Sequence, residues 1–298
     1  MERDSLLYKL RRKGQAMAYY LLPHAVLSKL YFRICLHETM DLKNPKKFNE
    51  KMQWLKLNYY PKDPLAVQGA DKYAVREYVE KKGYGDKLIK LLGTWERAQD
   101  IPWDTLPQKF MLKCNHGCAY NIACTDKDSL DKKSTQKQLN AWLRENFAAF
   151  NVELHYEKIK PRRIICEEYL GDVLTDYKFF CFHGEPKFFY VSSDLTHDRQ
   201  AKIGFFHMDG SVMPVIRDDY EHIGNIPMPD CLPDMVAAAK VLSEDFPFVR
   251  VDFFQIGDTF KFSELTFTPG ACMMPLKPKE YDVQWGKMLD LSALQKRF

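Results

Sequence analysis

The stretch RVDFFQIGDTFKFSELTFTPG, residues 250–270, has the composition of a β-hairpin that two carboxylates interrupt. Its aromatic and β-branched residues favour two strands on a pleated, half-buried surface. Asp252 and Glu264 stand inside these strands, although an unpaired charge near a core is costly. The hairpin therefore predicts that both carboxylates have a partner, and the nature of this partner decides the function.

Because side chains alternate across a strand, Arg250 and Asp252 share one face of the first strand, and Glu264 and Thr266 share one face of the second. A three-residue turn, 257–259, sets Asp252 opposite Glu264. Carboxylates that face each other repel unless a cation lies between them. Magnesium takes few protein carboxylates and completes its shell with water and substrate phosphates. The facing pair therefore predicts Mg²⁺ bound to nucleotide phosphates; the alternative is a surface pair on the wet face of the hairpin.

The turn itself tests this interpretation. A two-residue turn at 257–258 is favoured by composition. Without further adjustment it sets Asp252 opposite Ser263 and sends Glu264 to the other face of the sheet. A bulge that adds one residue restores the pairing of the carboxylates. A shared cation thus requires either the three-residue turn or a bulge.

Composition narrows the class of protein. The chain has 298 residues, 46% of them hydrophobic, and a formal net charge of +4. The length indicates one large or two coupled domains, and the charge is too mild for a nucleic-acid-binding protein. Eight scattered cysteines without a secretory signal predict a reduced cytoplasmic protein. The spacing of Cys114, His116, Cys118 and Cys124 fits no zinc-knuckle pattern.

Helices and strands are mixed without regular alternation, which predicts an α+β fold. Helices are expected over residues 44–60, 71–83, 127–147 and 233–246 and near the C-terminus, and strands over residues 88–95, 109–117, 162–170 and 201–210. Residues 176–194 are expected to form a hairpin of two strands around the turn HGEP (183–186). The most apolar stretch, 16–36, is interrupted by Pro23 and by charged residues, so we expect no transmembrane helix. It is either a helix packed on the body of the protein or an amphipathic helix on a membrane surface.

Several motifs occur together in a characteristic order. The hairpin resembles the metal-binding hairpin of ATP-grasp enzymes, especially D-alanine–D-alanine ligases. DKYAVREYV (71–79) resembles their D-K helix, and FMLKCNHG (110–117) resembles their strand that ends in a phosphate-binding lysine. With KFNEKMQWLK (47–56) and DYKFFCF (176–182), the set resembles the TupA-like branch of ATP-grasp proteins, linked to bacterial teichuronopeptide, capsule and other surface-polysaccharide biosynthesis.

The resemblance implies an ATP-grasp fold, in which two α+β subdomains clasp ATP between antiparallel sheets. It implies an N-terminal helical extension over 1–60 and an ATP-grasp region over 61–298. Within that region we expect a lid subdomain at about 105–170 and a metal- and acceptor-binding subdomain at 171–298.

The resemblance also assigns roles to single residues. Two lysines would bind ATP phosphates, the glutamates would accept hydrogen bonds from adenine or ribose, and the two residues after them would offer backbone groups. The nucleotide contacts so assigned are Lys72, Lys113, Glu167, Glu168, Tyr169 and Leu170. Asp176 and Lys178 share a strand face and are assigned to the cofactor site as contacts of ribose or phosphate, with the acceptor as the alternative. Asp252, Glu264 and Thr266 would hold Mg²⁺, and Arg250 would stabilise charge on the transferring phosphoryl group. Tyr120, in a loop with one glycine, is expected either to fold over a ligand or to leave a weakened phosphate lid.

The implied function is an ATP-dependent carboxylate–amine ligase of the cytoplasm, with contact at the inner face of the membrane as a minor hypothesis. It would amidate a uronic acid of a surface glycan with an amino acid or amine, through an acylphosphate. The alternatives are a phosphotransferase acting on a sugar hydroxyl, a glycosyltransferase, and a nucleotide-binding protein that has lost catalysis.

Overall fold

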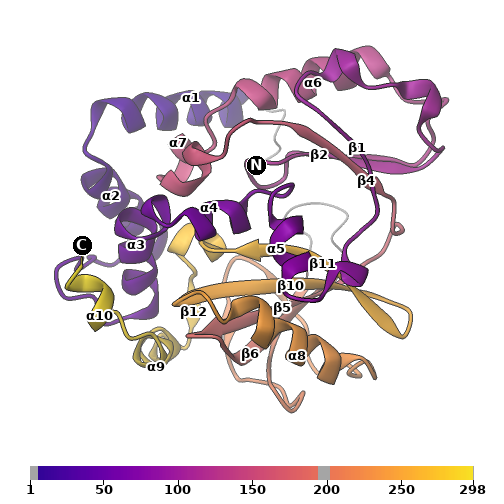
Figure 1. The fold of residues 1–298 in the computed structure, drawn as a ribbon. Helices are drawn as coiled ribbons and strands as arrows, with labels where there is room; N and C mark the ends of the chain where they lie inside the picture. Colours follow the sequence, from indigo (N-terminus) through magenta and orange to yellow (C-terminus); the bar gives the residue numbers. More distant parts are fainter. Residues whose placement is uncertain (1–5, 194–201, 298) are drawn as a thin grey trace.

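The computed structural model describes residues 6–193 and 202–297. Within these residues, most of the strands belong to two sheets in which neighbouring strands are mainly antiparallel (Figure 1). The helices are α1 (Leu6–Leu21), α2 (His24–Leu36), α3 (Phe48–Asn58), α4 (Pro64–Ala70), α5 (Val75–Lys81), α6 (Lys132–Arg144), α7 (Ala148–Asn151), α8 (Leu232–Ser243), α9 (Glu280–Met288) and α10 (Ser292–Gln295). The strands are β1 (Leu91–Trp95), β2 (Phe110–Cys114), β3 (Asn121–Cys124), β4 (Ile164–Glu168), β5 (Thr175–Phe182), β6 (Glu185–Ser193), β7 (Lys202–His207), β8 (Ile216–Arg217), β9 (Glu221–His222), β10 (Phe248–Ile256), β11 (Thr259–Thr266) and β12 (Leu276–Lys277). This mixture confirms the α+β prediction. The expected domains and strands include residues 1–5, 194–201 and 298, which lie outside the described residues.

The smaller main sheet has four antiparallel strands in the order β1-β4-β2-β3. Its central strands β2 and β4 are mostly buried, and α6 packs against β2. In Figure 1 this sheet curves over the upper right of the molecule, apart from the larger sheet below it.

The larger sheet has six strands in the order β11-β10-β5-β6-β7-β9, with only β7 and β9 parallel. Helix α8 packs on one face of β10, β5 and β6. On the other face, α3 and α9 cover one end, where Trp285 of α9 stacks on Phe188 with ring centroids 4.1 Å apart and Phe48 of α3 packs beside it. This aromatic cluster forms the hydrophobic core at that end of the larger sheet. Beyond the cluster, the same face of the sheet carries charged side chains.

The hairpin β10–β11 has the tight turn favoured by composition. Ile256 pairs with Thr259, so the turn is the two residues 257–258 and not the three-residue alternative. Gly257 has φ +56°, a conformation that glycine adopts at little cost. A bulge between Asp252 and Phe253 then adds one residue, and Asp252 pairs with Glu264. The second of the two expected routes thus brings the carboxylates together.

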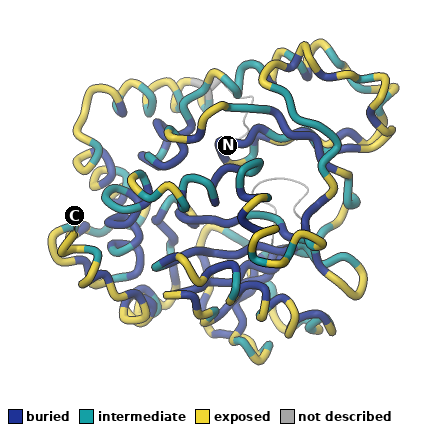
Figure 2. The backbone as a smooth tube through the Cα atoms, in the orientation of Figure 1, coloured by how far each residue is buried: buried dark blue, intermediate teal, exposed yellow. Residues whose placement is uncertain are grey.

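The described part of the N-terminal region contains the helices α1, α2 and α3, with a non-helical stretch at residues 37–47 between α2 and α3. Proline at position 23 separates α1 from α2, and α1 packs against α7 while α2 packs on α3. No helix within residues 6–193 and 202–297 is long and apolar enough to cross a membrane. Figure 2 shows that the strands of both main sheets are largely buried, whereas the outer sides of the N-terminal helices are exposed.

Candidate active site

A row of polar side chains crosses the larger sheet directly beyond the aromatic cluster. The register pairs Glu264 of β11 with Asp252 of β10, Asp252 with Lys178 of β5, and Lys178 with Tyr190 of β6. Paired residues of neighbouring strands project from the same face. The alternation that places aromatic side chains under α3 and α9 therefore places this row at the edge of that packing.

Asp252 is completely buried at the centre of the row. Arg250 binds it with two hydrogen bonds, Nε to Oδ1 at 2.7 Å and Nη2 to Oδ2 at 2.5 Å, and Lys178 Nζ lies 2.9 Å from Oδ2. Such charge-assisted, bidentate contacts are the strong ones among protein hydrogen bonds. The charge of Asp252 is thus fully compensated by two buried cations.

Glu264 is more open, with 27% of its side chain exposed. Its Oε2 accepts from Lys72 Nζ at 3.0 Å, its Oε1 accepts from the hydroxyl of Thr266 at 3.0 Å, and Arg250 Nη2 lies 3.7 Å away. Burial opposes ionisation of Glu264, but the attraction of Lys72, Lys178 and Arg250 outweighs it and holds the pKa of the carboxyl well below its ordinary value. Glu264 is therefore a carboxylate at neutral pH, with its charge facing an accessible space.

The backbone around Lys72 explains why an aspartate precedes it. Asp71 Oδ1 accepts from the amides of Tyr73 and Ala74 and from the side chain of Asn115. The amide of Lys72 donates to the carbonyl of Asn115 at 3.1 Å. These contacts fasten the turn before α5 to the end of β2, so that Lys72 points at Glu264.

Asp176 extends the row along β5. Lys178 Nζ hydrogen-bonds to Asp176 Oδ2, whereas the buried Oδ1 has no partner among the residues that the structure describes. Burial raises the pKa of Asp176 to about 6, against the attraction of Lys178. A buried acceptor without a partner is costly, and it indicates a contact that a ligand would complete.

A second charged cluster lies on the smaller sheet. Lys113 of β2 and Arg76 of α5 both bind Glu167 of β4, at 2.7 Å and 3.3 Å. Glu168 is exposed and takes no part. The hydroxyl of Tyr169 donates to Asp172 at 2.5 Å. Arg76 was missed from the sequence, although it follows Lys72 by four residues and such a spacing favours one helix face.

The two clusters differ in charge. On the larger sheet, three cations (Arg250, Lys178 and Lys72) meet three carboxylates (Asp252, Asp176 and Glu264). On the smaller sheet, two cations share one carboxylate. Together the clusters carry one positive charge more than negative charges, which favours an anionic ligand.

The loop between β2 and β3 does not contain a free aromatic lid. Tyr120 is buried, stacks on Trp142 with centroids 5.3 Å apart, and donates its hydroxyl to Glu145 at 2.6 Å. The expectation that Tyr120 folds over a ligand is therefore wrong. The tyrosine instead anchors the loop to α6 and the segment after it, because its ring is large enough to enter that core.

Residues of α3 hold the segment that follows β11. Residues 270–272 have three successive positive φ values, +57°, +54° and +62°, for Gly270, Ala271 and Cys272. Gln53 donates to the carbonyls of Ala271 and Cys272, and Lys56 donates to that of Ala271. Asn49 bonds both the amide and the carbonyl of Met274. The KFNEKMQWLK motif thus supports a strained backbone next to the hairpin; its spacing of 49, 53 and 56 is one helix face.

The hairpin offers only a small number of oxygen atoms that could bind magnesium. Within the described residues, no three His, Cys, Asp or Glu side chains converge as a metal-binding group. Two carboxylates on facing strands and one hydroxyl are present, however, and Mg²⁺ commonly takes one or two carboxylates plus substrate phosphates. The donor set fits a metal that arrives with a nucleotide.

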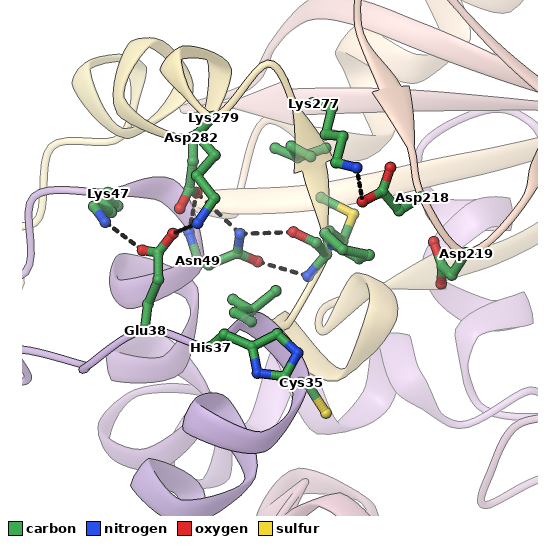
Figure 3. A pocket seen from close by; sticks show the side chains of 14 residues that line it. Cys35, His37, Glu38, Lys47, Asn49, Asp218, Asp219, Lys277, Lys279 and Asp282 are labelled. Carbon is green, nitrogen blue, oxygen red and sulfur yellow. Dashed lines mark hydrogen bonds and ion pairs between the residues drawn. The ribbon is translucent and has the colours of Figure 1, made fainter.

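A pocket of about 430 Å³ is lined in part by residues 274–277, which follow the strained segment. Figure 3 shows Glu38 between Lys47 and Lys279, and Lys277 against Asp218, along its walls. Asn49, which also lines the pocket, donates to the backbone carbonyl of Met274. The pocket is separate from the charged row and adjoins the same segment after β11.

Comparisons with known proteins now add to this geometry. Residues 50–290 match the family model described as TupA-like ATPgrasp. Among solved structures, the ADP complex of N5-carboxyaminoimidazole ribonucleotide synthetase is 14% identical, with 73% of this chain and 50% of that chain covered and a TM-score of 0.45. D-alanine–D-alanine ligase from Bacillus anthracis complexed with ATP is 14% identical, with 78% of this chain and 68% of that chain covered and a TM-score of 0.46. L-amino acid ligase from Bacillus licheniformis is 12% identical, with 70% of this chain and 44% of that chain covered and a TM-score of 0.42. The chain spans about half the length of the first of these proteins. No curated protein matches the sequence.

Proposed function

The chain belongs to the TupA-like ATP-grasp family and has its α+β ATP-grasp fold, and on this premise we propose that it is an ATP-dependent carboxylate–amine ligase. The observation that carries the proposal is the charged row, in which Arg250, Asp252 and Glu264 meet at 2.5–3.7 Å beside Lys72. The family context suggests a uronic acid of a bacterial surface polysaccharide as the carboxylate and an amino acid or amine as its partner. We place the reaction in the cytoplasm, which agrees with eight free cysteines.

The nucleotide would lie between the two sheets. Lys113 and Arg76, which share Glu167, and Lys72 would bind phosphate oxygens; Lys178 and Asp176 would contact phosphate or ribose. We keep Glu167 or Glu168, with the backbone of Tyr169 and Leu170, as the adenine and ribose contacts. The lid at about 105–170 and the subdomain at 171–298 remain our proposed boundaries: β2 and β4 of the lid supply Lys113 and Glu167, and β5, β10 and β11 supply the charged row. Strand β1, which pairs with β4, precedes the proposed lid in the chain.

Magnesium fits the row through an exchange of partners. At present the carboxylates are compensated by Lys72, Lys178 and Arg250. Phosphate oxygens would compete for these cations, and Asp252, Glu264 and Thr266 would then be available to the metal. When bound, Mg²⁺ supplies neutralisation of phosphate charge.

The reaction needs positioned charges more than a side-chain nucleophile. A carboxylate oxygen of the acceptor attacks the γ-phosphorus of ATP. The bond between this phosphorus and the bridging oxygen breaks, and ADP leaves. The amine nitrogen then attacks the acyl carbon, the bond to phosphate breaks, and the nitrogen loses a proton. Arg250, beside Asp252 and Glu264, would stabilise the charge that develops on the phosphoryl oxygens.

The test is a product assay with Mg·ATP, D-glucuronate or D-galacturonate, and glycine. Appearance of ADP, inorganic phosphate and an amide supports the ligase. ADP with a phosphorylated sugar contradicts it and identifies a phosphotransferase. If ATP binds but neither product forms with these or other carboxylates and amines, the protein is a nucleotide-binding protein without this activity.

A further inference from the structure

Arg217 of β8 is a buried cation that the proposed ATP site does not use. Its side chain is 8% exposed. It forks onto Asp219, with Nε to Oδ1 at 3.0 Å and Nη2 to Oδ2 at 2.6 Å, and its guanidinium lies 4.6 Å from the ring centroid of Tyr220. A planar fork of this kind matches a carboxylate, and Asp219 displays that recognition within the protein.

The position of Arg217 links the pocket with the charged row. A Cβ on Gly270 would stand 3.8 Å from its Nη2, so the guanidinium lies against the strained segment after β11. Asp219, which is 45% exposed, also lines the pocket, together with residues 274–277 that follow that segment. On the other side, Tyr190 accepts from Arg250 Nη1 at 3.3 Å, and the phenol of Tyr190 also helps to raise the pKa of Arg217, against the effect of burial.

We infer that Arg217 anchors the carboxylate of the acceptor, a sugar acid whose polar body occupies the adjoining pocket. The inference rests on the proposed ligase function and names the place of its second substrate. The acceptor carboxylate displaces Asp219, whose exposed position lets it turn toward solvent. The pocket volume of about 430 Å³ and its hydroxyl-compatible walls, with Glu38, Asp218 and Lys277, suit a small saccharide.

The experiment measures binding of D-glucuronate and D-galacturonate by calorimetry in the presence of Mg·AMP-PNP, with D-glucose as the control that lacks a carboxylate. We expect a uronate to bind and glucose not to bind. Arg217→Ala and Arg217→Lys should weaken uronate binding roughly tenfold or more, because a charge-assisted fork is lost. Asp219→Asn should tighten it, because a competing carboxylate is removed.

The opposite signs distinguish this role from a structural ion pair. If Asp219→Asn weakens uronate binding as much as Arg217→Ala does, or if both Arg217 variants bind like the wild type, the inference is wrong. AMP-PNP affinity in the same titrations verifies folding. Wild-type protein that binds AMP-PNP and neither uronate contradicts this inference alone, whereas failure to bind AMP-PNP contradicts the proposed function.

A separate observation concerns the outer surface of α1 and α2. Nine of the fourteen exposed large apolar side chains in the described chain lie there: Leu7, Leu10, Met17, Tyr20, Leu21, Leu22, Val26, Leu30 and Ile34. On α2 the exposed residues recur every four positions, and the inward side carries the buried Leu27 and Phe32. The helices are therefore apolar on two sides, and only one side packs on the protein (Figure 2).

All the charged side chains of this segment are positive. Residues 6–37 contain six lysines and arginines and no aspartate or glutamate. Arg11, Lys13, Lys29 and Arg33 are exposed beside the apolar residues. Exposed apolar side chains flanked by basic ones fit the interface of a membrane that carries anionic lipid headgroups. We propose that α1 and α2 dock the protein on such a surface.

Co-sedimentation with vesicles tests the surface. We expect binding to vesicles with about one-third phosphatidylglycerol, weaker binding at high salt, and little binding to phosphatidylcholine alone. The double variants Leu10→Ser/Met17→Ser and Arg11→Glu/Lys29→Glu should each reduce binding at least roughly tenfold. Val173→Ser/Val283→Ser, which removes exposed apolar residues elsewhere, is the matched control and should bind normally.

Two outcomes contradict membrane docking. One is vesicle binding that all three double variants leave unchanged. The other is absence of vesicle binding together with a dimer, measured by light scattering, that only the variants of α1 and α2 dissociate. The surface would then be an interface between two copies of the chain.

Discussion

The charged clusters of the two sheets are built on opposite principles. On the larger sheet, cations and carboxylates are equal in number, and Asp252 is completely buried among its partners. On the smaller sheet, Lys113 and Arg76 share Glu167 and are left with a positive excess. A balanced cluster responds to a ligand only by exchanging partners, whereas a cluster with an excess attracts an anion directly. The first suits a site where metal and phosphate arrive together, the second a site for phosphate alone.

The largest effect is expected from Asp252→Asn. Loss of this carboxylate removes a proposed metal ligand and leaves Arg250 and Lys178 buried without their shared partner. We expect magnesium-dependent ATP consumption to disappear and stability to fall by about 3–5 kcal/mol. Denaturant unfolding and an ADP-release assay measure the two effects. A variant as stable and as active as the wild type would show that the balanced cluster has neither role.

Glu264→Gln sharpens the comparison within the larger sheet. Activity should be lost as for Asp252→Asn, but stability should change by only about 1 kcal/mol, because Glu264 is partly exposed and solvent screens its pairs. The folded-state pKa of Glu264 lies below its ordinary value of 4.5. Its stabilising contribution is therefore complete above about pH 4.5 and is lost as the pH falls toward the folded-state pKa.

Unfolding free energies of the wild type and of Glu264→Gln, measured from pH 7 to pH 3, test this dependence. The difference between the two proteins should shrink at the acidic end. A difference that grows as the pH falls would contradict the assigned direction of the pKa shift.

Substitutions in the charged cluster of the smaller sheet should change the affinity for ATP and leave the free energy of unfolding nearly unchanged. Lys113→Ala should weaken ATP binding roughly tenfold, since a phosphate-facing ammonium is removed. Glu167→Gln should also weaken ATP binding, by a smaller factor, because a carboxylate that we propose as a contact of adenine or ribose loses its charge and remains only a neutral acceptor. Fluorescence titration with a labelled nucleotide measures both. Unchanged or tighter binding in Glu167→Gln would contradict this contact and would show that Glu167 chiefly competes with phosphate for Lys113 and Arg76.

Glu168→Gln is expected to have the smallest effect. Glu168 is exposed and lies on the opposite face of β4 from its neighbour Glu167. ATP affinity and turnover should change less than about twofold, because surface substitutions away from special contacts are usually within 0.5 kcal/mol. A loss of affinity comparable with that of Lys113→Ala would move the adenine contact from Glu167 to Glu168.

The sequence predicted the charges better than their partners. Alternation along β10 and β11 was enough to place Asp252 opposite Glu264 once a bulge was allowed. It could not choose between a bulge and a longer turn, because both preserve the same faces. It also could not show Arg76 beside Glu167, since that contact joins α5 to β4 across 91 positions.

Two further residues show where local patterns end. Tyr120 lies in a loop with a single glycine, and the sequence alone allowed it to cover a ligand, but its packing on Trp142 fixes it in the core. Gln53 is an ordinary helix residue by propensity. Its function of bonding the carbonyl of Cys272 depends on a segment more than two hundred positions away.

The support that α3 gives to residues 270–274 constrains the order in which the protein can mature. Asn49 and Met274 are separated by 225 positions, so the strained segment lacks its hydrogen-bond partners until both have emerged from the ribosome and met. The hairpin strands and both charged clusters use residues up to position 266 and can pair earlier. A chain truncated before residue 270 and released from the ribosome should therefore be able to form the hairpin pairs without the neighbouring segment, and competence toward a second substrate should require the residues that follow.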